Sequence, residues 1–236
     1  MSTASTEHES RVQRFRSDLA ELDARDFIRK HITTGRLVEI APDDYYELRR
    51  LVAKEFGLHP SAVILVGSCR TGFSIRPKKR YHRAHPASDL DVAMVSREQF
   101  DHYWDGVFEH ARCDAAWKRT GNYRCFVDML FDGWIDPRGL PTVPTFSQAR
   151  QWVDFFDGLM RSRRFGSRRI TGRLYRNWDR LESYQEIGIS SCHAELDCHN
   201  RGNQIGVSFR CLMEILRASP YCIPRSVPYN RHSSDD

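Results

Sequence analysis

Val63-Ile-Leu-Val-Gly-Ser68 is an apolar run that ends in two small residues, and Ser88-Asp-Leu-Asp-Val-Ala-Met-Val95 is a second apolar run that carries two aspartates. Short apolar runs bounded by turn-forming residues are typical of buried strands. Successive side chains of a strand alternate between its faces, so Asp89 and Asp91 are predicted to point to the same side. Mg²⁺ in nucleotide sites is held by carboxylates together with substrate phosphates. The two runs therefore predict a nucleotide-handling site at one edge of a sheet.

The order of these residues, Gly67-Ser68 followed by Ser88-Asp-Leu-Asp-Val92, resembles the signature of the DNA polymerase β-like nucleotidyltransferase superfamily. The resemblance covers well under half of the chain. It implies that Gly67 and Ser68 hold a nucleoside triphosphate, and that Asp89 and Asp91 are catalytic residues that bind Mg²⁺ or Mn²⁺. The alternative is a buried strand whose aspartates cap turns or pair with arginines. Two carboxylates in so apolar a run are costly to bury without a cation, which favours the metal site.

A third catalytic carboxylate is expected from the resemblance, because superfamily members usually add one from a neighbouring strand in the form Val-Asp-apolar. Val127-Asp128-Met129 fits that form within the run Tyr123–Phe131. We therefore expect a third strand there, with Asp128 as a further catalytic and metal-binding residue. The same run also fits a helix with Asp128 on its exposed face, and in that case the site has only two carboxylates.

The segment between Ser68 and Asp89 is 20 residues long, about twice what compact superfamily members use. Its excess is Arg76–His85, which carries five formal positive charges and no acid. This segment is predicted to be an inserted loop beside the site. We expect Arg70, Lys78 and Lys79, with the neighbouring Arg80, to neutralise the phosphates of the nucleotide. A solvated basic hairpin without a ligand is the other interpretation, since a short basic cluster alone is weak evidence.

Helical spacing of apolar residues predicts helices on both sides of this region. The predicted helical segments are residues 8–31, 42–56, Glu98–His110 and 147–161, and the inward residues of the third are Phe100, Tyr103, Trp104 and Val107. Together with strands at Ala62–Val66 and Leu90–Val95, they predict an α/β (α+β) fold in which helices flank a small mixed sheet. We expect a nucleotidyltransferase core at residues 1–140 and a mainly helical region at 141–236.

Arginines are concentrated between residues 161 and 180, where eight of them accompany a single acid. Helical spacing places Arg169, Arg173, Arg176 and Arg180 in one row, and like charges at this spacing repel each other. Such a row is tolerated more easily when phosphates neutralise it, although pairing with acids elsewhere in the fold is an alternative. Further on, Cys192-His193 and Cys198-His199 lack the usual intervals of a zinc site. Residues 206–216 are predicted to form a final strand or helix.

Composition places the chain among ordinary globular proteins, with 236 residues, 40% hydrophobic residues and a net charge of +5. No stretch has the 18 or more apolar residues that a membrane span needs, so no membrane partner is expected. The first residues lack a basic and then apolar signal segment, and the seven cysteines form no secreted framework. A cytoplasmic protein with reduced thiols is therefore expected.

The leading functional hypothesis is an enzyme that transfers NMP from an NTP to a hydroxyl acceptor and releases pyrophosphate. The basic loop and the arginines favour RNA or another polyanion over a cationic acceptor. Many small bacterial members of the superfamily belong to toxin–antitoxin or phage-defence loci, so the resemblance implies such a context. The alternative is a catalytically inactive nucleotide- or RNA-binding module of the same fold. The weak sequence signal for a third carboxylate favours this alternative.

Overall fold

The computed structural model describes residues 3–144 and 146–201, and the side chains of residues 5–144 and 146–194. The element predicted at residues 206–216 lies outside these ranges, as do the side chains of Cys198 and His199.

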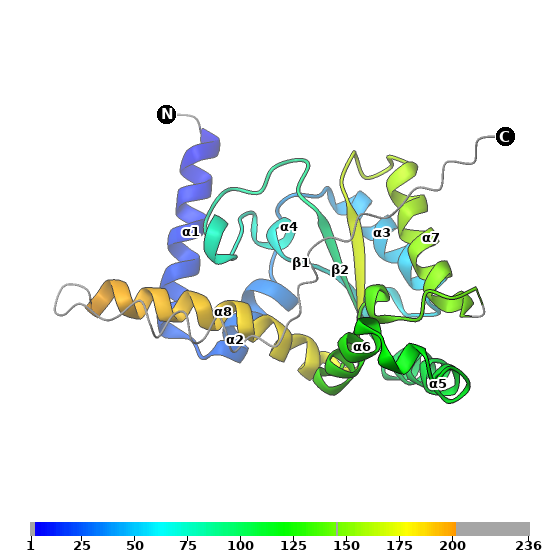
Figure 1. The fold of residues 1–236 in the computed structure, drawn as a ribbon. Coiled ribbons are helices and arrows are strands. Elements are labelled where there is room, and N and C mark those ends of the chain that lie inside the picture. The colour runs from blue at the N-terminus through cyan, green and yellow to red at the C-terminus, as the bar shows by residue number, and fades with distance from the viewer. Residues whose placement is uncertain (1–2, 145, 202–236) are drawn as a thin grey trace.

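A mixed four-stranded sheet with helices on both faces forms the described part of the chain (Figure 1). Its strands are β1 (Val63–Val66), β2 (Leu90–Val95), β3 (Trp134–Ile135) and β4 (Ile170–Tyr175). Its α-helices are α1 (Thr3–Glu21), α2 (Ala24–Ile28), α3 (Pro42–Glu55), α4 (Ser68–Thr71), α5 (Arg97–Cys113), α6 (Gly121–Asp132), α7 (Ser147–Arg161) and α8 (Trp178–Arg201). The short helical turns are η1 (Arg29–Thr33, π-helical), η2 (Pro60–Ala62), η3 (Pro77–Lys79), η4 (Trp117–Arg119) and η5 (Pro137–Gly139).

The strands lie in the order β1-β2-β4-β3. The pairs β1–β2 and β3–β4 are antiparallel, whereas β2 and β4 are parallel. The predicted class, helices flanking a small mixed sheet, is therefore confirmed at this level. Since β4 comes from residues 170–175 and pairs with β2, the sheet continues beyond the division expected near residue 140.

The two faces of the sheet bury separate hydrophobic clusters, as the alternation of side chains along a strand requires. Leu90, Val92 and Met94 of β2 pack with α3, α5 and α7. Ala93 and Val95, which point the opposite way, pack with α1, α2, η1 and α8. The alternation places Asp91 on the second face, the side that α1, α2 and α8 occupy in Figure 1.

The run Tyr123–Phe131 is part of helix α6, so the prediction of a third strand there was wrong. The helix is capped at its start by Thr120, whose Oγ1 accepts the N–H of Tyr123 at 3.2 Å. It ends at Gly133, which adopts the left-handed conformation with φ of 79°. Phe126 and Met129 face inward from this helix, and Asp128 is exposed.

The prediction of a helical row of arginines in residues 161–180 was also wrong, because the centre of that segment is strand β4. Arg173 lies on this strand, and Arg180 lies on α8. Trp104 of α5 was predicted to face inward, but it is 43% exposed, so this prediction was wrong. The other three predicted inward residues of α5 are buried. The helices expected at residues 8–31, 42–56, 98–110 and 147–161 are confirmed as α1 to η1, α3, α5 and α7.

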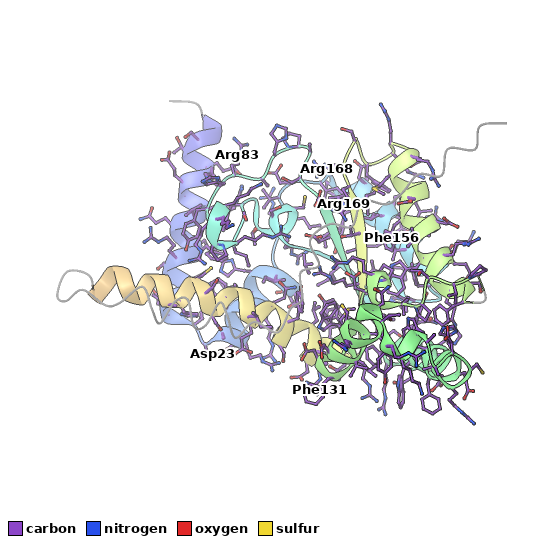
Figure 2. The ribbon with its side chains drawn as sticks, viewed as in Figure 1. Asp23, Arg83, Phe131, Phe156, Arg168 and Arg169 are labelled. Atoms are coloured by element: carbon purple, nitrogen blue, oxygen red, sulfur yellow. The ribbon has the colours of Figure 1, made fainter. Side chains whose placement is uncertain are left out.

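Gly172 of β4 lets α7 approach the sheet, because a Cβ there would overlap the ring of Phe156 (Figure 2). We expect Gly172→Ala to lower the free energy of unfolding by about 1–3 kcal/mol through overpacking. Gly158→Ala is the control, since Gly158 lies in α7 with nothing within 4 Å of its Cβ position. Replacing this helical glycine should stabilise the protein by roughly 0.5–1 kcal/mol. Urea unfolding measures both changes, and a Gly172→Ala protein as stable as wild type would refute the packing.

No helix in the part of the chain that the structure describes is long and apolar enough to cross a membrane.

Candidate functional site

Gly67 and Asp91 face each other where β1 and β2 pair. Val66 is in register with Asp91, and Gly67 follows directly at the end of β1. Gly67 has φ of 72° and ψ of −155°, a conformation that essentially only glycine adopts. A Cβ at this position would lie 2.9 Å from Oδ2 of Asp91. Glycine is therefore required at position 67 for two reasons: the backbone conformation of the turn, and the close approach of the Asp91 carboxylate.

The segment before β2 is fixed to α4 by the thiol of Cys69. Its Sγ donates to the backbone carbonyl of Asp89 at 3.2 Å and lies 3.8 Å from that of Ser88. Burial raises the pKa of Cys69 to about 11, so the thiol keeps its proton at neutral pH and acts as a donor. Ser68 begins α4 on the same turn and is half-buried. The structure thus brings Gly67, Ser68, Asp89 and Asp91 to one end of the β1–β2 pair, as the sequence predicts.

Neither aspartate forms an ion pair within the described ranges. Oδ1 of Asp91 accepts a hydrogen bond from Oγ1 of Thr171 at 3.0 Å, and Oδ2 faces Gly67. Asp89 is exposed, and among the described side chains it has no hydrogen bond or ion pair. The alternative that these aspartates cap turns or pair with arginines therefore receives no support from their contacts.

The strand beside β2 contributes no third carboxylate to this edge. Thr171 of β4 is in register with Asp91, and β4 contains no acidic residue. Asp128, which the resemblance favoured, lies instead on the exposed face of α6, a helix and not a strand. Among the residues with described side chains, no cluster of three His, Cys, Asp or Glu is arranged to hold a metal. The site has two candidate carboxylates.

The residues expected to neutralise phosphates are placed differently from one another. Lys78 and Lys79 lie in η3 of the loop between α4 and β2, and both are exposed. Arg80 reaches α8, where its Nη2 donates to Oγ of Ser191 at 2.8 Å. Arg70 is buried, and its Nη2 donates to the carbonyl of Thr33 at 3.0 Å. Arg70 therefore contacts η1, and none of its described contacts is with Asp91.

Two of the arginines concentrated between residues 161 and 180 lie where β4 begins, next to the strand that carries the aspartates. The N–H of Leu90 donates to the carbonyl of Arg169 at 2.8 Å, so Arg169 neighbours the residue after Asp89. Figure 2 shows Arg168 and Arg169 at the end of the sheet where β4 begins. Both line a cavity of about 490 Å³ together with Arg161 and Arg163. The sequence analysis missed this placement, and the alternation in Ile170–Tyr175, with its central glycine, was the signal that could have indicated a strand.

Arg173 lies on the same face of the sheet as Asp91 but is held by other groups. Its Nη1 donates to the hydroxyl of Tyr184 at 2.7 Å and its Nε to Oδ2 of Asp136 at 3.3 Å. Burial alone would lower the pKa of Arg173, but the neighbouring tyrosines and the carboxylates raise it above its ordinary value. Arg173 is therefore a cation near Asp91 that forms no ion pair with it among the described side chains.

The donor set suits a hard cation. Two carboxylates separated by one residue, one of them with an oxygen that lies against a glycine, provide the oxygen ligands that Mg²⁺ and Mn²⁺ prefer. Asp89 and Asp91 are the residues that would hold such an ion. Because these are only two protein ligands, phosphate oxygens and water must complete its coordination.

We expect Gly67→Ala to disturb this site more than the fold. Its left-handed backbone would cost about 1–3 kcal/mol, and the new methyl group would displace the Asp91 carboxylate. Gly57→Ala is a matched control, because Gly57 also has a positive φ, 62°, but its nearest neighbour is Gln99. Both variants should lose stability in urea, and only Gly67→Ala should lose magnesium-dependent nucleotide binding. Wild-type nucleotide affinity in Gly67→Ala would contradict this account.

Comparisons of the chain with protein families, with curated proteins and with solved structures found no match.

Proposed function

We propose that the protein is a metal-dependent nucleotidyltransferase, which transfers NMP from an NTP to a hydroxyl of a polyanionic acceptor. One observation carries this proposal: Asp91, without an ion pair among the described residues, lies against a glycine whose missing side chain makes room for its Oδ2. Asp89 precedes it by two residues, and Ser68 follows the glycine. The resemblance of these residues to the DNA polymerase β-like signature supports the same conclusion.

The chain's own residues would bind and orient the reactants. The hydroxyl of Ser68 and the backbone of the Gly67-Ser68 turn would hold terminal phosphates, since glycine allows close approach. Asp89 and Asp91 would hold Mg²⁺ or Mn²⁺, and a bound ion of this kind stabilises the charge that develops on the attacking and leaving oxygens. Most of the rate enhancement would then come from positioning and electrostatics.

The charges around the carboxylates favour a polyanionic acceptor such as RNA. The cavity of four arginines lies on the β4 side of Asp89. The loop Arg76–His85 lies between α4 and β2, and its Lys78 and Lys79 are exposed. Phosphates on the acceptor would neutralise both groups, and binding would then weaken as the salt concentration rises.

A second candidate function, nucleotide or RNA binding without turnover, is favoured by Thr171. This residue occupies the position on β4 opposite Asp91, where a third carboxylate would complete a two-metal site. Its hydroxyl donates to Asp91 and offers no negative charge. In this case the protein would bind nucleotide with metal and release no pyrophosphate.

Pyrophosphate release separates the two candidates. The protein is incubated with each of the four labelled NTPs, Mg²⁺ or Mn²⁺, and cellular RNA or protein as acceptor. The proposal predicts pyrophosphate release and label in the acceptor, both lost in Asp89→Asn. Metal-dependent nucleotide binding without release would establish the binding module. Absence of both would refute the two candidates together.

A further inference from the structure

A second cationic cavity, of about 540 Å³, lies between α1, η1 and α4. Its volume is within the range of about 300–1,000 Å³ that is typical of small-ligand pockets. Besides His31, its charged lining consists of five cations and one acid, namely Arg11, Arg14, Lys30, Arg36, Arg70 and Glu7. Neither Asp89 nor Asp91 lines it, so it differs from the candidate catalytic site in composition.

Arg70 is the buried cation of this cavity and has no anionic partner among the described residues. Its side chain belongs to a residue only 4% exposed, and the guanidinium donates to the carbonyl of Thr33. Its buried Nε has no hydrogen-bond partner. A buried charge is normally paired, because an unpaired one is costly to remove from water. The structure follows this rule elsewhere, since the buried Asp136 and Glu182 are both paired with arginines.

Two of the four other cations of the cavity have no ion pair among the described residues. Arg14 and Arg36 are exposed, and neither has an ion pair within the described ranges. Arg11 pairs with Glu7 at 2.8 Å, on the exposed surface of α1. Lys30 shares Asp18 with His31, at 2.9 and 2.8 Å. The lining of the cavity therefore has an excess of positive charge.

We propose that this cavity binds a small polyphosphate, a ligand with at least two linked phosphate groups, without a metal ion. Arginine's planar fork matches phosphate oxygens in pairs, and four of the five cations are arginines. A single carboxylate or phosphate monoester would neutralise only part of this charge, whereas linked phosphates span several cations at once. The polyphosphate can be free or carried by a nucleotide. This site goes beyond the proposed transferase activity.

The loss of hydration at Arg70 also favours the binding of an anion in this cavity. Burial lowers the pKa of Arg70, because the charged guanidinium has lost water without gaining an anion, although its interaction with Tyr45 acts against this. A phosphate in the cavity would supply the missing negative charge.

The test is titration of the full chain with tripolyphosphate and, separately, with ATP, both in EDTA. The key variant is Arg14→Glu/Arg36→Glu, which reverses two exposed side chains and spares the buried Arg70. The matched control is Arg119→Glu/Arg150→Glu, which makes the same change of net charge at exposed residues outside the cavity. We expect the key variant to weaken binding at least about tenfold, since hydrogen bonds between charged groups are lost.

The same titration on Asp91→Asn separates this proposal from the transferase. Binding in EDTA that survives in Asp91→Asn and falls only in Arg14→Glu/Arg36→Glu supports the cavity. Tighter binding of ATP would identify a nucleotide as the source, and tighter binding of tripolyphosphate a free polyphosphate. No binding of either ligand, an equal loss in the control variant, or a loss in Asp91→Asn would overturn the proposal.

Discussion

Replacing Asp91 by asparagine is expected to abolish the magnesium-dependent part of nucleotide binding, together with any pyrophosphate release. The change preserves the shape of the side chain and its hydrogen bond with Thr171, and removes the negative charge beside Gly67. Even residues that only support a metal ligand contribute about 10- to 100-fold to metal affinity or activity. Loss of a ligand itself should therefore exceed a hundredfold. Titration with NTP in Mg²⁺, combined with a pyrophosphate assay, measures the effect.

Asp105→Asn is the matched control for this change. Asp105 is an exposed aspartate of α5, so the same charge is removed away from β1 and β2. Asp105→Asn should bind and turn over nucleotide like wild type, and both variants should unfold at the same denaturant concentration as wild type to within about 0.5 kcal/mol. If Asp91→Asn and Asp105→Asn have the same nucleotide affinity, Asp91 does not hold the metal.

Asp136→Ala is expected to have the largest effect on stability, a loss of about 3–5 kcal/mol, because it removes a buried carboxylate and leaves the part-buried Arg173 without its anion. The carboxylate of Asp136 accepts from Nε and Nη2 of Arg138 at 2.7 Å each, and from Nε of Arg173 at 3.3 Å. Arg173 in turn donates to Tyr184 of α8. This network joins β3, β4 and α8, so its loss should lower the stability of the whole sheet. Chemical denaturation of Asp136→Ala, with Asp105→Ala as control, tests the prediction.

The contribution of Asp136 should depend on pH. Burial would raise its pKa, but the hydrogen bonds and charge of Arg138 outweigh burial and hold the pKa below the ordinary 3.8. A carboxyl whose pKa is lower in the folded state stabilises that state above its unfolded pKa, and the gain disappears as the pH falls through the folded value. The stability difference between wild type and Asp136→Asn should therefore be constant above pH 5 or so and shrink below about 3.8. A difference that grows on acidification would contradict the pairing.

The edge that carries Gly67 and the two aspartates was predictable because its signals are local. The apolar runs of β1 and β2 are bounded by turn residues, and a glycine before a serine marks the end of the first. The proline at the start of α3 and the amphipathic pattern of α7 were equally clear signals.

Tyr123–Phe131 could not be assigned by periodicity, because its apolar residues fit a buried strand and a helix equally well. The decision lies in the flanks, where Thr120 caps the first turn and Gly133 ends the last. These positions were available in the sequence and outweigh a short motif such as Val-Asp-Met. Asp128 was thus placed by resemblance on an element that the flanks do not support.

Strand β4 was missed for a different reason, since its pairing partner β2 lies far away in the sequence. The arginines in and around it suggested a helical row, whereas in the structure they lie on different elements, such as Arg173 on β4 and Arg180 on α8. Arg173 pairs with Asp136 inside the fold, and Arg176 lies 3.5 Å from Asp101 of α5. The buried position of Arg70 was equally hidden, because the turn η1 that accepts its hydrogen bond is formed by residues 29–33.

The most direct test of the account measures how much Mg²⁺ strengthens nucleotide binding. Each NTP is titrated into wild type and into Asp89→Asn/Asp91→Asn, once with Mg²⁺ and once with EDTA. We predict that Mg²⁺ strengthens binding to wild type and leaves binding to the double variant unchanged. An affinity that is the same with and without Mg²⁺ in wild type, or a Mg²⁺ effect that persists in the double variant, would contradict the central claim.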